Sequence, residues 1–133
     1  MATYRVQVIA DKRSCPVLLS NGNLIEEGEA KGGRHFAVWD DPTPKPCYLF
    51  ALVAGNLVHI KDTFTTMSGT DVDLFIYVRK GDEKQCNHAM ESLIKSMKWD
   101  EDVYGREYQY DRFNIVAVSD FNMGAMENTA LNI

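Results

Sequence analysis

The residue best placed for chemistry is Glu127, a glutamate that lies shortly after the apolar run at residues 115–118. It belongs to a short segment of small and apolar side chains, residues 123–128. If this segment is extended, alternate side chains face opposite sides. One side then carries Met123, Ala125 and Glu127, and the other carries Gly124, Met126 and Asn128. The first side offers a flexible apolar wall, a small floor and one carboxylate.

Two interpretations of Glu127 follow from the residue types. Gly124 and Ala125 let another backbone approach closely, as a peptide lying alongside the segment would require. A carboxylate in apolar company needs a partner, and the free α-ammonium group of a peptide is a natural one. The simpler alternative is a glutamate at the end of a strand, paired with a surface lysine. The residue types alone favour this alternative.

Other residues that could bind a metal or act as a nucleophile are scattered. His35, His59 and His88 are far apart in the sequence, whereas a zinc site needs three or four converging ligands. Cys86 and His88 are two apart on an expected helix and so do not face each other. Cys47 is expected to be a small apolar residue in a buried strand. We therefore expect no zinc site and no thiol nucleophile within this chain.

Composition and charge limit the class of protein. The 133 residues are 45% hydrophobic and 25% charged, as in ordinary soluble domains. The formal net charge of −5 and the lack of a Lys and Arg cluster argue against a nucleic-acid partner. We expect no membrane partner, because no apolar run is long enough to span a bilayer and no signal pattern opens the chain. The three widely spaced cysteines predict reduced thiols and a cytoplasmic location.

The first half of the chain has the pattern of short strands. Five strands are expected, at residues 4–9, 17–19, 24–25, 34–39 and 47–54. Asn21-Gly22 predicts a hairpin between the second and third of them. The prolines within residues 41–46 predict a rigid loop, and the last strand is apolar on both faces and so is expected to be buried on both. Five strands without a helix predict part of a β-sandwich.

The second half changes style after Gly55-Asn56, where we expect a domain boundary. Strands at residues 57–64 and 72–78 are expected to form a hairpin, and a last strand is expected at 113–118. Between them a helix is predicted, with Asp82 as its cap and Gln85 completing a capping box. Its apolar stripe is Met90, Leu93, Ile94, Met97 and Tyr104, and Gly105 suits its end. The predicted fold class is α+β.

The segment Gly124-Ala125-Met126-Glu127-Asn128 resembles the G-A-M-E-N exopeptidase motif of the zinc-dependent aminopeptidase N family. Four more stretches are similar to bacterial members of that family: VLLSNGN at 17–23, PKPCYLFALVAG at 44–55, DTFTTMSG at 62–69 and SMKWDE at 96–101. The resemblance covers essentially the whole chain, in order. It implies that residues 1–56 are the later part of a sandwich-like, all-β N-terminal domain. Residues 57–133 would then open a thermolysin-like metallopeptidase catalytic domain.

The resemblance also implies roles for residues of the motif. Glu127 would bind the free N-terminal amine of a peptide substrate, and this contact makes members of the family remove single residues from the N-terminus. The backbone of Gly124 and Ala125 would lie along the peptide, and Met123 would shape the pocket for the first side chain. The remaining expected substrate-binding residues are Met126 and Asn128.

In the family, the zinc ligands, the general base and a stabilising tyrosine follow the motif, and a second amine-binding residue precedes the segment seen here. We therefore expect an internal fragment of a zinc aminopeptidase, inactive by itself, whose partners are peptides with a free N-terminus and the remainder of its own catalytic domain. The family pattern predicts Lys-Gly after the motif, where this chain has Thr129-Ala130. The alternative is a non-enzymatic module that binds peptides or associates with other proteins. The apolar, uncapped ending at Leu131 and Ile133 favours a fragment, with an exposed apolar face.

Overall fold

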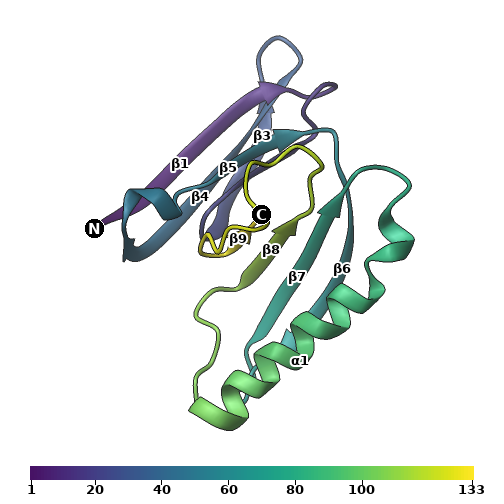
Figure 1. The fold of residues 1–133 in the computed structure, drawn as a ribbon. Helices are drawn as coiled ribbons and strands as arrows, with labels where there is room; N and C mark the ends of the chain where they lie inside the picture. Colours follow the sequence, from purple (N-terminus) through teal and green to yellow (C-terminus); the bar gives the residue numbers. More distant parts are fainter.

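The computed structural model describes all residues, 1–133, and contains nine strands, two 3₁₀-helices and one α-helix (Figure 1). In chain order these are β1 (Ala2–Asp11), β2 (Val17–Ser20), β3 (Asn23–Ala30), β4 (Arg34–Lys45), η1 (Cys47–Leu49), β5 (Leu52–Gly55), β6 (Val58–Thr65), β7 (Asp71–Val78), η2 (Glu83–Gln85), α1 (Asn87–Tyr104), β8 (Arg112–Val116) and β9 (Leu131–Asn132). The predicted α+β class is confirmed. No helix combines the length and the apolar character that crossing a membrane requires.

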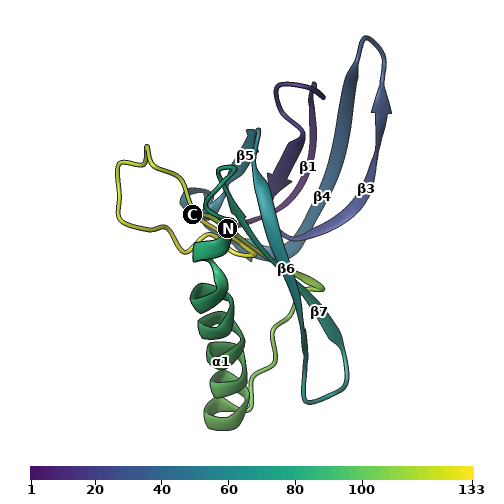
Figure 2. The same cartoon turned by 90° about the vertical axis from the view of Figure 1, so that its right-hand side faces the viewer.

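The strands form three sheets. An antiparallel sheet has the order β1-β4-β3, and a second, two-stranded sheet pairs β2 with β5. The second half of the chain forms a four-stranded sheet in the order β6-β7-β8-β9, in which the β7-β8 and β8-β9 pairs are parallel. The predicted hairpin of β6 and β7 is confirmed. In Figures 1 and 2, α1 lies along one side of this sheet and the strands of the first half lie away from the helix.

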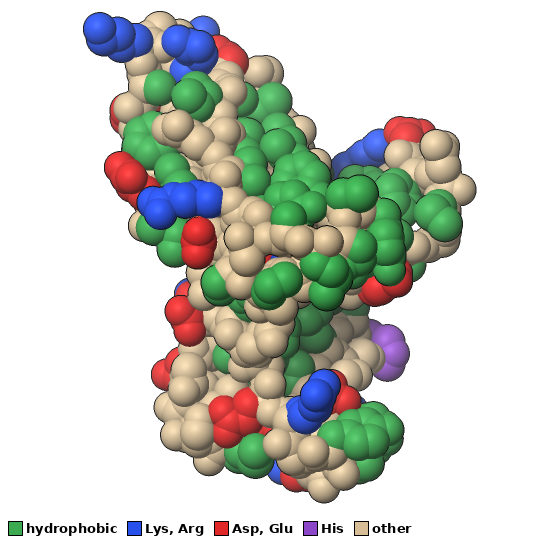
Figure 3. Space-filling model, turned by 90° about the vertical axis from the view of Figure 1, so that its left-hand side faces the viewer, with side chains coloured by type: hydrophobic (Ala, Val, Ile, Leu, Met, Phe, Trp, Pro, Cys, Tyr) green, Lys and Arg blue, Asp and Glu red, His purple; other side chains and the backbone are tan.

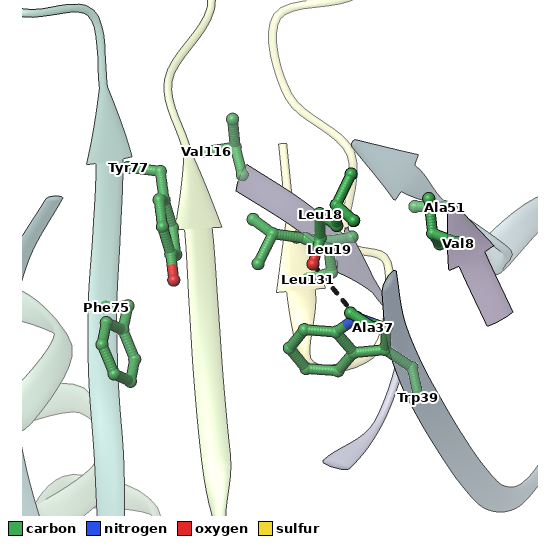
Figure 4. Packing of buried hydrophobic residues seen from close by; sticks show 10 residues of the cluster. All are labelled: Val8, Leu18, Leu19, Ala37, Trp39, Ala51, Phe75, Tyr77, Val116 and Leu131. Atoms are coloured by element: carbon green, nitrogen blue, oxygen red, sulfur yellow. Dashed lines mark hydrogen bonds between the residues drawn. The ribbon is translucent and has the colours of Figure 1, made fainter. Parts of the chain in front are cut away.

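Strand β7 is buried on both faces and joins two hydrophobic clusters. Its side chains facing α1 are Val72, Leu74, Ile76 and Val78, which pack in one cluster with Met90 and Met97 of the helix. Phe75 and Tyr77 belong to the other cluster, together with Trp39 of β4 (Figure 4). The indole nitrogen of Trp39 donates a 3.1 Å hydrogen bond to the carbonyl of Leu18. Because both faces of β7 are covered, the strand is almost continuously apolar.

The hairpin expected across Asn21-Gly22 is wrong, because β2 pairs with β5 while β3 pairs with β4. The chain passes from one sheet to the other at this corner. Gly22 has a φ of +89°, and a Cβ placed on it would lie 2.1 Å from the carbonyl oxygen of Asp40. Glycine is required here because two backbones approach closely. A hairpin turn also favours glycine, because it needs a positive φ, so the residue type alone does not distinguish the two cases.

The proline-rich residues 41–46 form more regular structure than expected. β4 continues to Lys45, so the predicted loop is wrong. The neighbour β3 pairs with β4 only as far as Asp40, and beyond that point β4 has β1 as its single partner. Pro42 and Pro44 therefore lie where β4 is an edge strand, a place where the missing N–H of proline is tolerated.

The buried strand expected at residues 47–54 is also wrong. Residues 47–49 form η1, and β5 covers only Leu52–Gly55. Cys47 is exposed rather than buried. Tyr48 and Leu52 are 64% and 47% exposed, whereas Ala51 is buried in the cluster around Trp39, so only part of this apolar run contributes to the core. Apolar residues on both faces indicated burial of both faces, and sequence alone could not show that Tyr48 and Leu52 are left exposed.

Helix α1 begins later than predicted and ends as predicted. Asp82 precedes η2 and makes no side-chain cap, and Cys86 stands at the N-cap of α1, also without a side-chain capping bond. Tyr104 is exposed and packs edge-on against Trp99, so it is not part of the buried stripe. At the other end Gly105 has a φ of +60° and donates a backbone hydrogen bond to Glu101. Left-handed glycine at this position closes the helix.

The domain boundary expected between residues 56 and 57 stays a prediction. β6 begins at Val58, directly after it, yet the cluster around Trp39 draws residues from both sides of that point. Leu131 belongs to this cluster and is fully buried. The apolar ending at Leu131 is therefore covered, contrary to the expectation of an uncapped end. Ile133 is partly buried against the same cluster.

Candidate functional site

Residues 117–133 leave the end of β8, form a loop and return as β9. Figure 2 shows the loop projecting from the body of the molecule as the yellow-green end of the chain. The backbone N–H of Ala117 donates to Tyr77, which ends the pairing of β8 with β7. Met126 and Ile133 then exchange two backbone hydrogen bonds, of 2.7 and 3.1 Å. This pair closes residues 126–133 into a narrow turn that fixes one end of the loop.

The segment 123–128 is not a strand, so the alternation expected for it does not extend along the whole run. Met123 and Gly124 lie in a bend, and no neighbouring strand pairs with residues 121–125. The backbone N–H and C=O groups of residues 121–125 take part in no backbone hydrogen bond. A Cβ added to Gly124 would meet nothing within 4 Å. The backbone here is both unpaired and open to close approach.

Two hollows flank this segment. The first, about 560 Å³, lies between the segment and residues 115–119 at the end of β8. The second, about 750 Å³, lies between the segment and residues 48–52. Both hollows are lined by the same four residues of the segment: Met123, Ala125, Met126 and Glu127. The segment is therefore a ridge between two mostly apolar hollows, each of a size that suits a small ligand.

The six residues selected from the sequence all lie on this ridge, but not in the same way. Gly124 lines only the first hollow and Asn128 only the second. Figure 3 shows hydrophobic side chains gathered on one face of the molecule. The exposed ones near the ridge are Tyr48, Phe50, Leu52, Phe121 and Met123. A ligand on the ridge would therefore contact flexible and aromatic apolar side chains beside one carboxylate.

Glu127 is exposed, and none of the ion pairs in the structure includes it. The pairing with a surface lysine that the residue types favoured is therefore not present. The nearest ion pair along the loop is an exposed one between Arg79 and Asp120, at 3.2 Å. Glu127 lines both hollows, and its unpaired carboxylate is available to a cationic ligand.

Asn128 differs from its neighbours because its side chain is used inside the fold. It is 3% exposed, and its Nδ2 donates a 3.1 Å hydrogen bond to the carbonyl of Leu49. Its contribution to a ligand site would therefore be to hold the ridge in place.

The two residues after the motif form the turn that brings the chain back as β9. Ala130 has a φ of +63° and is the only non-glycine residue with a positive φ. The family pattern predicts glycine at this position, and the left-handed backbone explains that preference. Alanine accepts the same conformation here at a cost of about 1 kcal/mol. The backbone carbonyl of Ala130 accepts from Asn114, which keeps the turn attached to β8.

Two of the three histidines contact other parts of the fold, and the third, His88, is exposed on α1. His35 forms a 2.7 Å hydrogen bond with the carbonyl of Cys15, and His59 packs against the rings of Phe75 and Tyr77. Burial, helped by the charge of Arg112, lowers the pKa of His59 below its ordinary value. No three His, Cys, Asp or Glu side chains are grouped so that they could hold a metal ion. The residues of this chain therefore do not fit a zinc site.

One residue behind the ridge was not selected from the sequence. Asn21 is 1% exposed, and its side chain contacts the backbone at both Leu49 and Thr129. Its place in an Asn-Gly pair predicted a turn and so gave no indication of a distant contact. Asn21 is recognised as a candidate only in the folded structure, which shows that its side chain is buried and which backbone groups it bonds.

Comparison with known proteins agrees with the resemblance found in the sequence. The model of the Peptidase family M1 domain matches residues 88–133. The chain is 55% identical to aminopeptidase N of Escherichia coli (strain K12) and 54% identical to that of Caulobacter vibrioides, over all 133 residues. It spans 15% of the length of each of these relatives.

A solved structure is similar as well. The crystal structure of Legionella pneumophila aminopeptidase A in complex with aspartic acid matches with a TM-score of 0.92 and 41% identity, covering 98% of this chain and 15% of that one. The predicted resemblance is thus confirmed in sequence and in fold. The chain belongs to the M1 peptidase family and corresponds to a segment of the bacterial aminopeptidases N.

Proposed function

We propose that these 133 residues are the part of a zinc-dependent aminopeptidase that recognises the free N-terminus of a peptide. The observation that carries the proposal is the unpaired carboxylate of Glu127 on a ridge between two apolar hollows. In addition, all 133 residues of the chain align with an aminopeptidase at 55% identity. In this proposal Glu127 accepts hydrogen bonds from the α-ammonium group of the substrate, which sets the enzyme to remove one residue at a time.

The backbone of the ridge supports a peptide lying alongside it. The groups of residues 121–125 have no backbone partners, so they are free to pair with an extended peptide as a neighbouring strand does. Gly124 leaves room for that approach. Met123 is 64% exposed and lines both hollows, so its flexible side chain can adapt to the first side chain of different peptides.

The residues described here bind and orient, and they supply neither a metal site nor a general base. In the proposed enzyme, zinc would polarise the scissile carbonyl and activate water, and it would be held by residues other than these. We therefore propose that the 133 residues alone do not hydrolyse peptides. We keep a cytoplasmic location as part of the proposal, on the basis of three free cysteines.

The test uses the full-length product of the gene that carries these residues. Hydrolysis of an alanyl chromogenic amide is measured for the wild type, for Glu127→Gln and for Glu91→Gln. Glu91 is an exposed glutamate on α1 without an ion-pair partner, so it is a matched control. We expect kcat/KM to fall about 30-fold or more in Glu127→Gln, because a charge-assisted contact is lost, and to stay unchanged in Glu91→Gln. Equal activity of all three proteins would refute the proposal.

A further inference from the structure

We infer that Asn21 is a positioning residue for amine recognition, which it serves by fixing the backbone next to Glu127; this inference rests on the proposed function. Asn21 directly follows β2 and stands more than a hundred positions before Glu127 in the sequence. Its side chain nevertheless bonds the backbone close to Glu127. Three hydrogen bonds of its side chain carry the argument.

The amide of Asn21 bonds two separate stretches of backbone and makes no bond within its own turn. Its Nδ2 donates to the carbonyl of Leu49 at 3.0 Å and to that of Thr129 at 2.9 Å. Its Oδ1 accepts from the N–H of Ala51 at 2.7 Å. The side chain thus joins residues 49–51 to the residue that stands two positions after Glu127.

A second asparagine strengthens the same connection. Nδ2 of Asn128 donates to the carbonyl of Leu49 at 3.1 Å, so Asn21 and Asn128 share one acceptor oxygen. A carbonyl oxygen has two lone pairs and can accept both bonds. Two buried amides therefore connect residues 128 and 129 to Leu49: the side chain of Asn128 itself and that of Asn21, which bonds Thr129. Glu127 immediately precedes these two residues. We call this arrangement of Asn21, Leu49 and Asn128 the asparagine clamp.

The corner that carries Asn21 is buried and closely packed. The residue after Asn21, Gly22, packs so closely against the backbone of Asp40 that a Cβ at this position would clash with it. The donor of Asn21 is therefore delivered to Thr129 from a fixed position, as a buried and fully bonded amide should be.

Glu127 needs such support because its own side chain has none. It makes no ion pair, and residues 121–125 before it have no backbone partners. The position of its carboxylate is thus set from the C-terminal side, by the Met126 and Ile133 pair and by the asparagine clamp. A displacement of the order of 1 Å at a substrate-positioning group costs about 100-fold in rate. Loss of the clamp should therefore weaken recognition of the amine selectively.

The experiment measures the affinities of the full-length gene product for two competitive inhibitors, alanine hydroxamate and propionohydroxamic acid. They differ only in the α-amine, so the ratio of their inhibition constants reports recognition of that group. This ratio does not depend on how much of a variant is folded. The proteins compared are the wild type, Asn21→Ala, Glu127→Gln and Ser20→Ala. Ser20→Ala removes a buried hydrogen bond from the same corner without touching residues 128 and 129.

We expect Asn21→Ala and Glu127→Gln each to reduce the preference for alanine hydroxamate by about tenfold or more, and Ser20→Ala to leave it unchanged. If Glu127→Gln reduces the preference and Asn21→Ala does not, the inference about Asn21 fails while the proposed function stands. If Glu127→Gln has no effect, the proposed function fails, and the positioning role of Asn21 fails with it. Should Asn21→Ala not fold, Asn21→Ser, which leaves a smaller cavity and a hydroxyl too short to reach both carbonyls, is measured with the same two outcomes.

Discussion

Substitution of Gly22 by alanine tests the close contact between the two sheets of the first half. At this corner the chain leaves β2 and enters β3, and the backbone of Gly22 touches that of β4. A Cβ at position 22 would lie 2.1 Å from the carbonyl oxygen of Asp40 and 2.7 Å from the Cα of Asp41. Both contacts are with backbone, so no side-chain rotation can relieve them.

The magnitude follows from two separate costs. A φ of +89° is left-handed, which costs an alanine about 1 kcal/mol. The clash with backbone adds about 3 kcal/mol or more, at the upper end of what overpacking costs. Gly33 provides a matched control, because it has a φ of +73° but nothing within 4 Å of an added Cβ. Gly33→Ala should therefore cost only about 1 kcal/mol.

The assay is amide hydrogen exchange in the full-length gene product, followed in peptides that contain residues 17–24. Local opening free energies fall by the cost of the substitution, and each 1.4 kcal/mol corresponds to about a tenfold faster exchange. We expect at least a several-hundred-fold faster exchange in Gly22→Ala, or loss of soluble protein, and no more than about a tenfold change in Gly33→Ala measured in its own turn. Equal effects of the two substitutions would show that the corner is not closely packed, and the reasoning would be refuted.

Three more predictions concern stability and activity. Tyr110→Phe removes the 2.7 Å hydrogen bond from the buried hydroxyl to Asp41, which joins the second half of the chain to the first. The free energy of unfolding, measured by urea denaturation, should fall by about 1–3 kcal/mol. An unchanged urea midpoint would contradict this. Burial, and then the charge of Arg112, lower the pKa of His59, so the folded state disfavours its protonation. As the pH falls through the unfolded value of 6.5, the unfolded state binds more protons, and the wild type should lose thermal stability relative to His59→Gln; parallel pH curves for the two proteins would be the contrary result. Finally, the purified 133-residue chain should show no zinc-dependent hydrolysis of an alanyl chromogenic amide, and any such rate that a chelator abolishes would overturn the proposal.

The parts of the fold that follow local rules could be predicted from the sequence. The apolar pattern of β6 and β7 predicted that they pair as a hairpin, and the almost continuously apolar β7 is covered on both faces. Gly105 closes the helix through a left-handed φ that only glycine adopts freely. Both features depend on residues close together in the chain.

The parts that failed depend on partners distant in the sequence. The Asn21-Gly22 pair has the residue types of a hairpin turn, but its role is decided by β5 and by residues 129 and 40, which no local pattern reveals. The apolar residues at 47–54 indicated a buried strand, whereas Tyr48, Phe50 and Leu52 lie on the surface beside the ridge. Similarly, the position of Glu127 was predicted by motif, but its lack of a protein partner is visible only in the structure.

The most direct test of the central claim is a crystal structure of the full-length gene product with alanine hydroxamate bound. The account predicts that the α-amine of the ligand lies within about 2.7–3.2 Å of the carboxylate of Glu127, with the ligand against the ridge of residues 123–127. An amine bound elsewhere, with Glu127 paired to another residue of the protein, would contradict the claim that this segment recognises the N-terminus of a peptide.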